Sequence, residues 1–310
     1  MNQENCISTD ILNQLKSSGF PAAFLPYHFI TQITEIYDDL PTRRTSTAFI
    51  ENTIKHLHNH QPPDISFEPL SFLIVAYPSE PAQVVLNDNG KQATIPIPPT
   101  YLDDAEQSQK LNDVLKSAVQ GYQTAHAKGI SQKLLAVYSG LGKYGRNNIC
   151  YTNEFGSFFN LRAYYTNIPC EDTSYPIAFL DSCESCELCK QNCPTGAIDQ
   201  YPVINAEKCL TLHNENKQSF PDWIPQSSHH TLIGCLRCQE ICPHNKPILA
   251  KSRHTLDLNE SETQTLLSSN LEAYPIELTQ KLKQFGFYEF MLPVLGRNAR
   301  LALINSHNGE

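Results

Sequence analysis

The stretch Cys183-Glu-Ser-Cys186-Glu-Leu-Cys189-Lys-Gln-Asn-Cys193-Pro194 decides the fold of this chain. Its C-x2-C-x2-C-x3-C-P spacing is that of thiolates that hold a [4Fe-4S] cluster. A second run, Cys235-Leu-Arg-Cys238-Gln-Glu-Ile-Cys242-Pro243, repeats the pattern without its first cysteine, where Leu232 stands instead. Cys209 lies between the two runs and can supply the missing thiolate. The eight cysteines therefore predict a chain that binds two clusters and transfers electrons.

The spacing also predicts how the ligands are shared, because in two-cluster proteins the fourth cysteine of each run binds the other cluster. The first set is then Cys183, Cys186, Cys189 and Cys242, and the second is Cys193, Cys209, Cys235 and Cys238. A zinc ribbon would use pairs of cysteines rather than a triple followed by Cys-Pro. A disulfide framework is typical of small secreted domains, which this chain does not resemble. The remaining Cys6, Cys150 and Cys170 are expected to be structural or bystander residues.

Composition indicates a globular protein and excludes several classes. The chain has 310 residues, 40% hydrophobic and 18% charged, which is enough for about two domains of roughly 150 residues each. Its net charge of -9 argues against broad electrostatic binding of nucleic acid. No apolar run is long enough to span a membrane, and the N-terminus has no basic and apolar signal regions. We therefore expect a soluble protein in the reducing cytoplasm, which suits oxygen-sensitive clusters.

Periodicity and turn residues predict a mixture of helices and strands. Residues 70–77 form a continuous apolar run typical of a buried strand, and Asn89-Gly90 predicts the turn of a hairpin between 84–86 and 94–95. Two further strands are expected within 149–165. Helices are expected at 10–18, 104–128, 260–268, 276–285 and 294–304. Asn259 and Glu262 form a capping-box-like pair before the third of these helices.

A glycine-rich block, residues 139–148, is the second informative feature. Gly140, Gly142 and Gly145 formally match G-x-G-x-x-G, and glycines let a backbone approach a ligand closely. A dinucleotide fingerprint should follow a strand and open a helix, however, whereas residues 148–152 have the character of a strand. The block is therefore either a turn between two elements or part of a ligand site.

Four blocks taken together resemble the epoxyqueuosine reductase family: residues 139–148, 155–159, 183–197 and 234–245. That family depends on cobalamin, carries two [4Fe-4S] clusters and shares a module with reductive dehalogenases. The resemblance implies an α+β protein. It comprises a nitroreductase-like α/β cobalamin-binding domain at 1–180, a ferredoxin-like two-[4Fe-4S] domain at 181–250 and a short helical C-terminal segment at 251–310.

The resemblance also implies a corrinoid site, with cobalamin bound base-off. The residues expected to contact it are Gly140, Leu141, Gly142, Lys143, Gly145, Asn147 and His126. The segment Thr124–Gly129 differs by one residue from the D-x-H-x-x-G loop that supplies a histidine to cobalt in methyltransferases. Without the aspartate that orients the imidazole, a solvated or structural histidine is the alternative for His126, and no protein ligand to cobalt is expected.

Tyr144 and Arg146 are the candidate catalytic residues. The family's proposed proton donor is an aspartate ahead of the glycine block, but no acid lies between Tyr122 and Tyr151 here. Tyr144 can replace it as a donor or can pack against the ligand. Arg146 stays charged and is expected to hold a carboxylate or a cofactor phosphate.

These observations predict a cobalamin- and iron–sulfur-dependent reductase that acts on a small molecule through Co(I), with electrons from two clusters. The predicted partners are that small molecule and an electron donor such as a ferredoxin or flavodoxin. Longer members of the resembled family add a helical-repeat domain that helps to bind tRNA, and this chain offers only a short helical tail in its place. Because the chain is also acidic and lacks the family's aspartate, tRNA is not expected as a partner. The alternatives are an electron-transfer protein without chemistry of its own, or an epoxyqueuosine-tRNA reductase.

Overall fold

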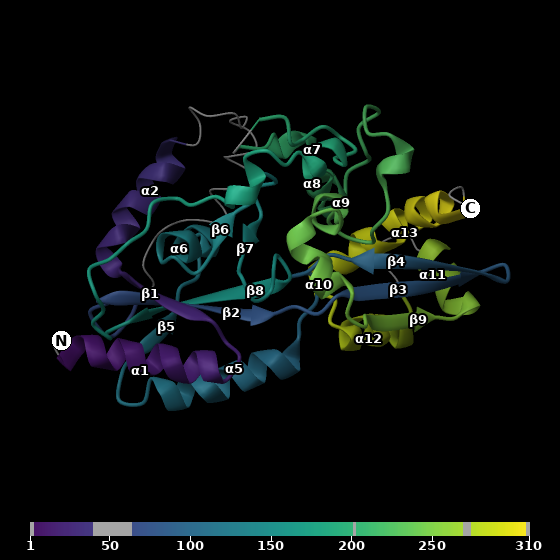
Figure 1. Ribbon diagram of the computed structural model, residues 1–310. Coiled ribbons are helices and arrows are strands. Elements are labelled where there is room, and N and C mark those ends of the chain that lie inside the picture. The colour runs from purple at the N-terminus through teal and green to yellow at the C-terminus, as the bar shows by residue number, and fades with distance from the viewer. Residues whose placement is uncertain (1–2, 40–63, 201–202, 269–273, 308–310) are drawn as a thin grey trace. The chain divides into compact units, whose positions relative to one another are not determined.

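The computed structural model describes residues 3–39, 64–200, 203–268 and 274–307 (Figure 1). The chain forms two compact units. The first unit comprises 1–78 and 106–186, and the second comprises 79–105 and 187–310. The fold mixes helices and sheets, as predicted. The bounds of the two units differ from those of the three predicted domains, and the nitroreductase-like character of the N-terminal domain stays a prediction.

An antiparallel four-stranded sheet organises the first unit, in the order β1 (Ala22–Pro26), β2 (Ser71–Pro78), β8 (Phe159–Thr166) and β5 (Thr124–His126). Side chains alternate across a strand, so β2 contributes to two cores. Phe72, Ile74 and Ala76 pack in the core that contains α6 (Gln132–Tyr138). Leu73 and Val75 pack in the other core, with α1 (Gln3–Ser17) and α5 (Ala105–Ala118). The predicted buried strand is thus confirmed.

The same unit corrects one prediction and adds detail to another. The helix expected at 104–128 ends at Ala118, because Gly121 adopts a φ of 87° and the chain then joins the sheet as β5. The two strands expected within 149–165 are present as β7 (Cys150–Tyr151) and β8, but they do not pair with each other. Instead β7 pairs with β6 (Lys143–Tyr144), while β8 pairs with β2. Helix α2 (Ile30–Asp39) and the 3-10 turn η1 (Tyr27–Phe29) follow β1.

The second unit contains a three-stranded sheet in the order β4 (Lys91–Ile97), β3 (Ala82–Asp88) and β9 (His254–Leu258). The predicted hairpin is confirmed, since Asn89 and Gly90 both have positive φ, as its turn requires. Strand β9 adds in parallel to β3. The core beneath this sheet is shared with α11 (Glu260–Ser268), α12 (Ile276–Phe285) and α13 (Leu292–His307). The C-terminal helices therefore belong to the core of this unit.

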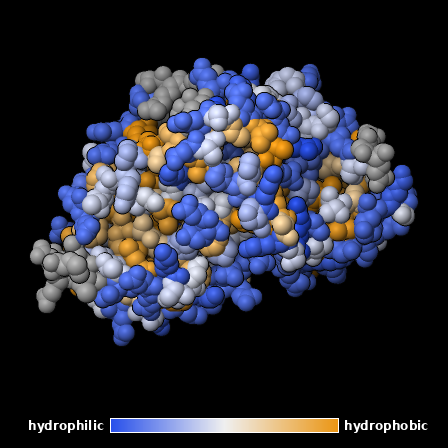
Figure 2. Space-filling model, viewed as in Figure 1, coloured by the Kyte–Doolittle hydropathy of each residue, from blue (hydrophilic) through white to orange (hydrophobic). Residues whose placement is uncertain are grey.

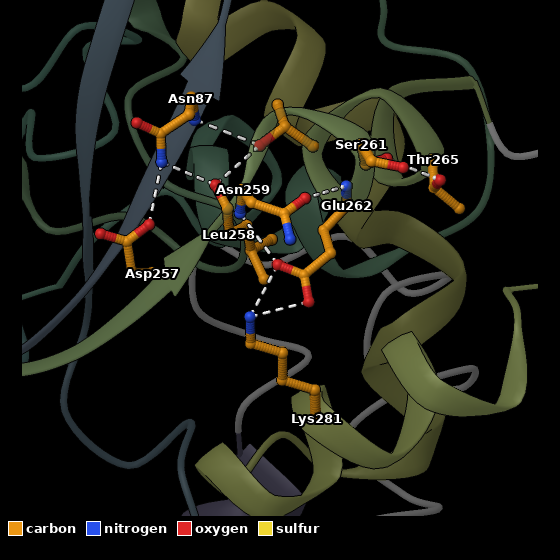
Figure 3. Close-up of polar contacts among 9 residues, drawn as sticks. Asn87, Asp257, Leu258, Asn259, Ser261, Glu262, Thr265 and Lys281 are labelled. Carbon is orange, nitrogen blue, oxygen red and sulfur yellow. Dashed lines mark hydrogen bonds and ion pairs between the residues drawn. The ribbon is translucent and has the colours of Figure 1, made fainter.

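The start of α11 is held by polar contacts that Figure 3 shows. The backbone N–H of Asn259 donates to Glu262 Oε2 at 2.8 Å, and the N–H of Glu262 donates to Asn259 Oδ1 at 2.9 Å, which confirms the capping box. Lys281 of α12 donates to the same carboxylate. Asn87 of β3 donates to Asp257 of β9 at 2.9 Å. The bond between Asn87 and Asp257 links segments that are 170 residues apart in the sequence.

The cysteine-rich segment is built from short elements. They are η4 (Asp181–Cys183), α7 (Leu188–Gln191), η5 (Ala206–Lys208), α8 (Leu210–Glu215), η6 (Gln226–Ser228), α9 (Arg237–Glu240), η7 (Pro243–Asn245) and α10 (Lys246–Leu249). The last 3-10 turn, η8 (Glu289–Met291), leads into α13. The face shown in Figure 2 is mostly hydrophilic, with separate hydrophobic patches. Over the described ranges, none of the helices has the length and apolar character needed to cross a membrane.

Candidate functional site

The two cysteine runs lie on short helices that pack together. Cys189 lies in α7 and Cys238 in α9, and the two helices are in contact. Asn192 fixes them by donating from Nδ2 to the carbonyl of Arg237 at 2.7 Å. All eight predicted ligands are free thiols, so none is used in a disulfide. Among the described residues, no group of His, Cys, Asp and Glu side chains is arranged to hold a single metal ion. The predicted occupants are clusters rather than single ions.

Three cysteines of the second predicted set lie close enough to influence one another. Burial raises the pKa of Cys235 to about 12, and the nearby Cys209 and Cys193 thiols act in the same direction. Burial also raises the pKa of Cys209, with a further contribution from Cys193. The Sγ of Cys193 accepts the backbone N–H of Ala197 at 3.3 Å, the kind of bond that stabilises a cluster thiolate. The lone Cys209 is therefore gathered with two members of its predicted set.

The first two cysteines of the first set are tied to the glycine block by Arg146. Its side chain is buried, with 9% exposed. Nε donates to the carbonyl of Cys186 at 2.7 Å, and Nη2 donates to the carbonyls of Cys183 at 2.6 Å and Glu184 at 3.2 Å. Cys242, predicted to belong to the same set, immediately precedes η7. These contacts of Arg146 differ from the carboxylate or phosphate contact expected from the sequence.

The glycine block is a turn between α6 and the β6–β7 pair, which excludes a dinucleotide fingerprint because no helix follows it. A Cβ on Gly140 would lie 2.7 Å from the ring of Tyr175, and one on Gly142 would lie 2.6 Å from Cys150 Sγ. A Cβ on Gly145 would lie 2.6 Å from the ring of Tyr151. Packing within the chain therefore disfavours a side chain at these positions, and Gly140 also has a φ of 75°, whether or not a ligand contacts them.

Tyr144 lies inside this turn, with 7% of its surface exposed. Its backbone N–H donates to Ala178 at 2.8 Å and its carbonyl accepts from Leu180 at 2.9 Å, so the residue is held on both sides. Its ring lies 6.2 Å from that of Phe179. Burial is the main cause that raises the pKa of the phenol, with Cys150 contributing next. The hydroxyl group therefore keeps its proton at neutral pH.

The other predicted contacts in the block differ in exposure. Gly140 and Lys143 are exposed and Leu141 is half-buried. Lys143 forms an ion pair with Asp181 at 3.4 Å. Asn147 is buried and donates to the hydroxyl of Tyr151 at 2.9 Å. Among these predicted contacts, Leu141, Lys143 and Gly140 are therefore the most accessible to a ligand.

His126 lies on the edge strand β5 and has a buried nitrogen without a partner. Its Nδ1 finds no hydrogen bond among the described residues. Burial lowers the pKa of the imidazole, and Arg162 and Lys128 lower it further, so the ring is neutral. A buried polar atom without a partner costs about 1–3 kcal/mol. This atom fits a site in which a bound group supplies the missing hydrogen bond, as expected for a cofactor-binding residue.

Tyr101 is a weaker candidate from the sequence, and its pairing with Glu215 beside Cys209 and Cys235 of the second cysteine set was not predicted. The hydroxyl of Tyr101 donates to the carboxylate of Glu215, 114 residues away in the sequence. The Tyr101 ring packs against Gly234, where a Cβ would lie 2.6 Å from the ring. Burial raises the pKa of Glu215, and the hydrogen bond from Tyr101 partly offsets this effect. No local pattern marks the pair, because only the folded chain brings the two residues together.

Residues 182–245 match the family described as the 4Fe-4S double cluster binding domain. The chain is 34% identical over 139 residues to the epoxyqueuosine reductase of Bacillus subtilis. The aligned segment covers 44% of this chain and 35% of the relative. The chain is 32% identical over 119 residues to the epoxyqueuosine reductase of Staphylococcus aureus, covering 38% of this chain and 30% of the relative. The matched segments thus span about a third of the length of these relatives.

Solved structures are similar over nearly the whole chain. A structure of epoxyqueuosine reductase from Bacillus subtilis has a TM-score of 0.63 at 22% identity, covering 97% of this chain and 82% of that one. A crystal structure of epoxyqueuosine reductase with an epoxyqueuosine-modified tRNA-Tyr stem loop has a TM-score of 0.60 at 23% identity, with 97% and 81% covered. At these identities the similarity shows a shared fold.

These findings confirm the predicted resemblance to the epoxyqueuosine reductase family and the two [4Fe-4S] clusters. They also support an iron–sulfur oxidoreductase. They correct one prediction. The exclusion of tRNA as a partner was wrong, because the relatives are epoxyqueuosine reductases and one similar structure holds a tRNA stem loop. Net charge was a poor guide, since an acidic chain can still bind nucleic acid through a local surface.

Proposed function

We propose that this chain is a cobalamin- and iron–sulfur-dependent reductase that acts on an epoxide. The main support for this proposal is the length of the segment that is similar to a reductase. The 139 residues matched in the Bacillus subtilis relative are about twice the length of the cluster segment, residues 182–245. A protein that only transferred electrons would be expected to match through its cluster segment alone. The alternative of a non-enzymatic electron-transfer protein is therefore less well supported.

The residues expected to hold the cofactors are those named from the sequence. The two sets of cysteines bind the clusters, and the gathered thiols of Cys193, Cys209 and Cys235 support that assignment. For the corrinoid, His126 provides a polar atom, its Nδ1, that has no hydrogen-bond partner among the described residues. Gly140 and Lys143 are exposed and provide an accessible surface. When bound, the corrinoid supplies the strongly reducing metal centre that the protein itself lacks.

Tyr144 is proposed as the proton donor. Loss of oxygen from an epoxide consumes protons, and no acidic residue lies between Tyr122 and Tyr151 to supply them. The Tyr144 phenol is protonated and buried, and the backbone of the residue is held by hydrogen bonds to Ala178 and Leu180. In a site without bulk water, such a hydroxyl group can deliver its proton to the oxygen on which negative charge develops. The backbone bonds fix the place of this donor in the turn.

The epoxide has two possible sources. One is epoxyqueuosine within a tRNA stem loop, which the named relatives make the first substrate to test. The other is a small-molecule epoxide, which belongs to the broader class, a small molecule, that the sequence predicts. Electrons would come from a donor protein such as a ferredoxin or flavodoxin, for which a chemical reductant can substitute in an assay.

The test is turnover by protein reconstituted without oxygen with iron, sulfide and cobalamin, and supplied with a chemical reductant. An epoxyqueuosine-containing tRNA stem loop and a small epoxide are assayed separately, and the products are identified by mass spectrometry. We expect reduction of one of them at a rate at least about 100-fold higher with cobalamin than without it. Equal rates with and without cobalamin would refute the proposal. A protein that binds both cofactors and reduces neither epoxide would refute an epoxide as the substrate. A protein that carries both clusters but binds no corrinoid would support the electron-transfer alternative.

A further inference from the structure

The guanidinium of Arg146 lies against the backbone of the first cysteine run. It donates to three carbonyl oxygens, those of Cys183, Glu184 and Cys186, at 2.6, 3.2 and 2.7 Å. Only 9% of the residue is exposed. Because these carbonyls span the first two predicted ligands, the arginine fixes the loop that presents both thiolates.

The position of Arg146 is set by the turn that carries it. The N–H of Gly145 donates to the carbonyl of Ile149 at 2.8 Å, and the side chain of Asn147 donates to the hydroxyl of Tyr151 at 2.9 Å. A side chain on Gly145 would clash with that same tyrosine ring. The residues on both sides of Arg146 are therefore anchored to β7 and the loop before it. The arginine connects this rigid turn to the cysteine loop.

The three partners of Arg146 in this loop are carbonyl oxygens, which carry no formal negative charge. Arginine remains protonated in proteins. Reduction adds negative charge to a cluster, and a positive charge held nearby stabilises the reduced form. Net charge and hydrogen bonding around a cluster are known determinants of its reduction potential. A buried site strengthens this effect, because the surroundings screen the charge less than water does.

We propose that Arg146 is a positioning residue that holds Cys183 and Cys186 in place and raises the reduction potential of the cluster they bind. This role differs from the anion binding expected from the sequence. It rests on the two-cluster part of the proposed function and needs neither the corrinoid nor the substrate. A lysine at this position would keep the positive charge, but its single ammonium group lacks the planar guanidinium that contacts three carbonyls. The effect of the charge and the effect of the carbonyl contacts can therefore be measured separately.

The experiment is an anaerobic redox titration of the full chain, reconstituted with both clusters and followed by EPR, together with iron analysis. In Arg146→Gln we expect one of the two midpoint potentials to fall. At a fixed potential, the ratio of reduced to oxidised cluster should drop about tenfold, which corresponds to a shift in midpoint potential of roughly 59 mV for a one-electron couple. The other potential should not change. Arg146→Lys should restore most of the potential but retain iron less well than the wild type.

Lys133→Gln is the matched control, because it removes one positive charge from an exposed side chain of α6, close to the same turn. Its potentials should equal those of the wild type. If both Arg146→Gln and Arg146→Lys retain less iron than the wild type, the loss follows the carbonyl contacts rather than the charge, and the positioning role is supported directly. Two unchanged potentials with full iron content in Arg146→Gln would overturn the proposal, as would equal loss of both clusters. Failure of the proposed function would appear differently: the wild-type protein would reduce no epoxide, although the midpoint potentials of its clusters still responded to the Arg146 substitutions as expected.

Discussion

Replacing Cys209 with alanine should lower the bound iron from about eight to about four atoms per chain, because one of two four-iron clusters loses a ligand. Cys209 is the only predicted ligand outside the two runs, and the structure gathers it with Cys193 and Cys235. The EPR signal of the other cluster should remain. Iron and sulfide analysis after anaerobic reconstitution measures the effect.

The control for this experiment is Cys170→Ala. Cys170 is a half-buried free thiol in the first unit, outside both predicted ligand sets. Its replacement should leave about eight iron atoms bound. A Cys209→Ala protein with two intact [4Fe-4S] clusters would show that the second ligand set is assigned wrongly.

Tyr144→Phe should lower turnover by about 100-fold or more, the usual range for loss of a positioned general acid. The phenol is buried and protonated, and phenylalanine keeps its ring packing against Phe179. Iron and cobalamin content should therefore be unchanged. Steady-state rates on the epoxide that the wild type reduces provide the measurement.

Tyr138→Phe provides the comparison for this variant. Tyr138 ends α6, close enough to Tyr144 to influence the pKa of its phenol, but it is less deeply buried. Its rate should stay within about threefold of the wild type, since it is not proposed to transfer a proton. If Tyr144→Phe is equally active, the tyrosine only packs in the turn and another group supplies the proton.

Features that depend on short spacing could be predicted from the sequence. The cysteine runs, the capping box of Asn259 and Glu262, and the end of α12 at Gly286 all involve residues a few positions apart. Gly286 has a φ of 113°, a left-handed conformation that glycine adopts readily at the end of a helix. Local chemistry is sufficient in these cases, because the chain itself brings the partners together.

Features that depend on distant pairing could not be predicted. Strand β9 joins β3 from more than 150 residues away, and β5 forms because β8 offers it a free edge. The bond between Tyr101 and Glu215 and the carbonyl contacts of Arg146 likewise exist only in the folded chain. The charge and shape of Arg146 were visible in the sequence, but its backbone partners were not. The nature of its role therefore required the structure.

The most direct test of the central claim is an anaerobic titration of the reconstituted chain with cob(II)alamin, followed by EPR. The account predicts a protein-bound, base-off cobalt signal without nitrogen superhyperfine splitting, and the same line shape in His126→Ala. That result would agree with a corrinoid held beside a neutral His126 that is not a ligand to cobalt. A protein that carries both clusters but leaves the spectrum of free cobalamin unchanged would contradict the claim.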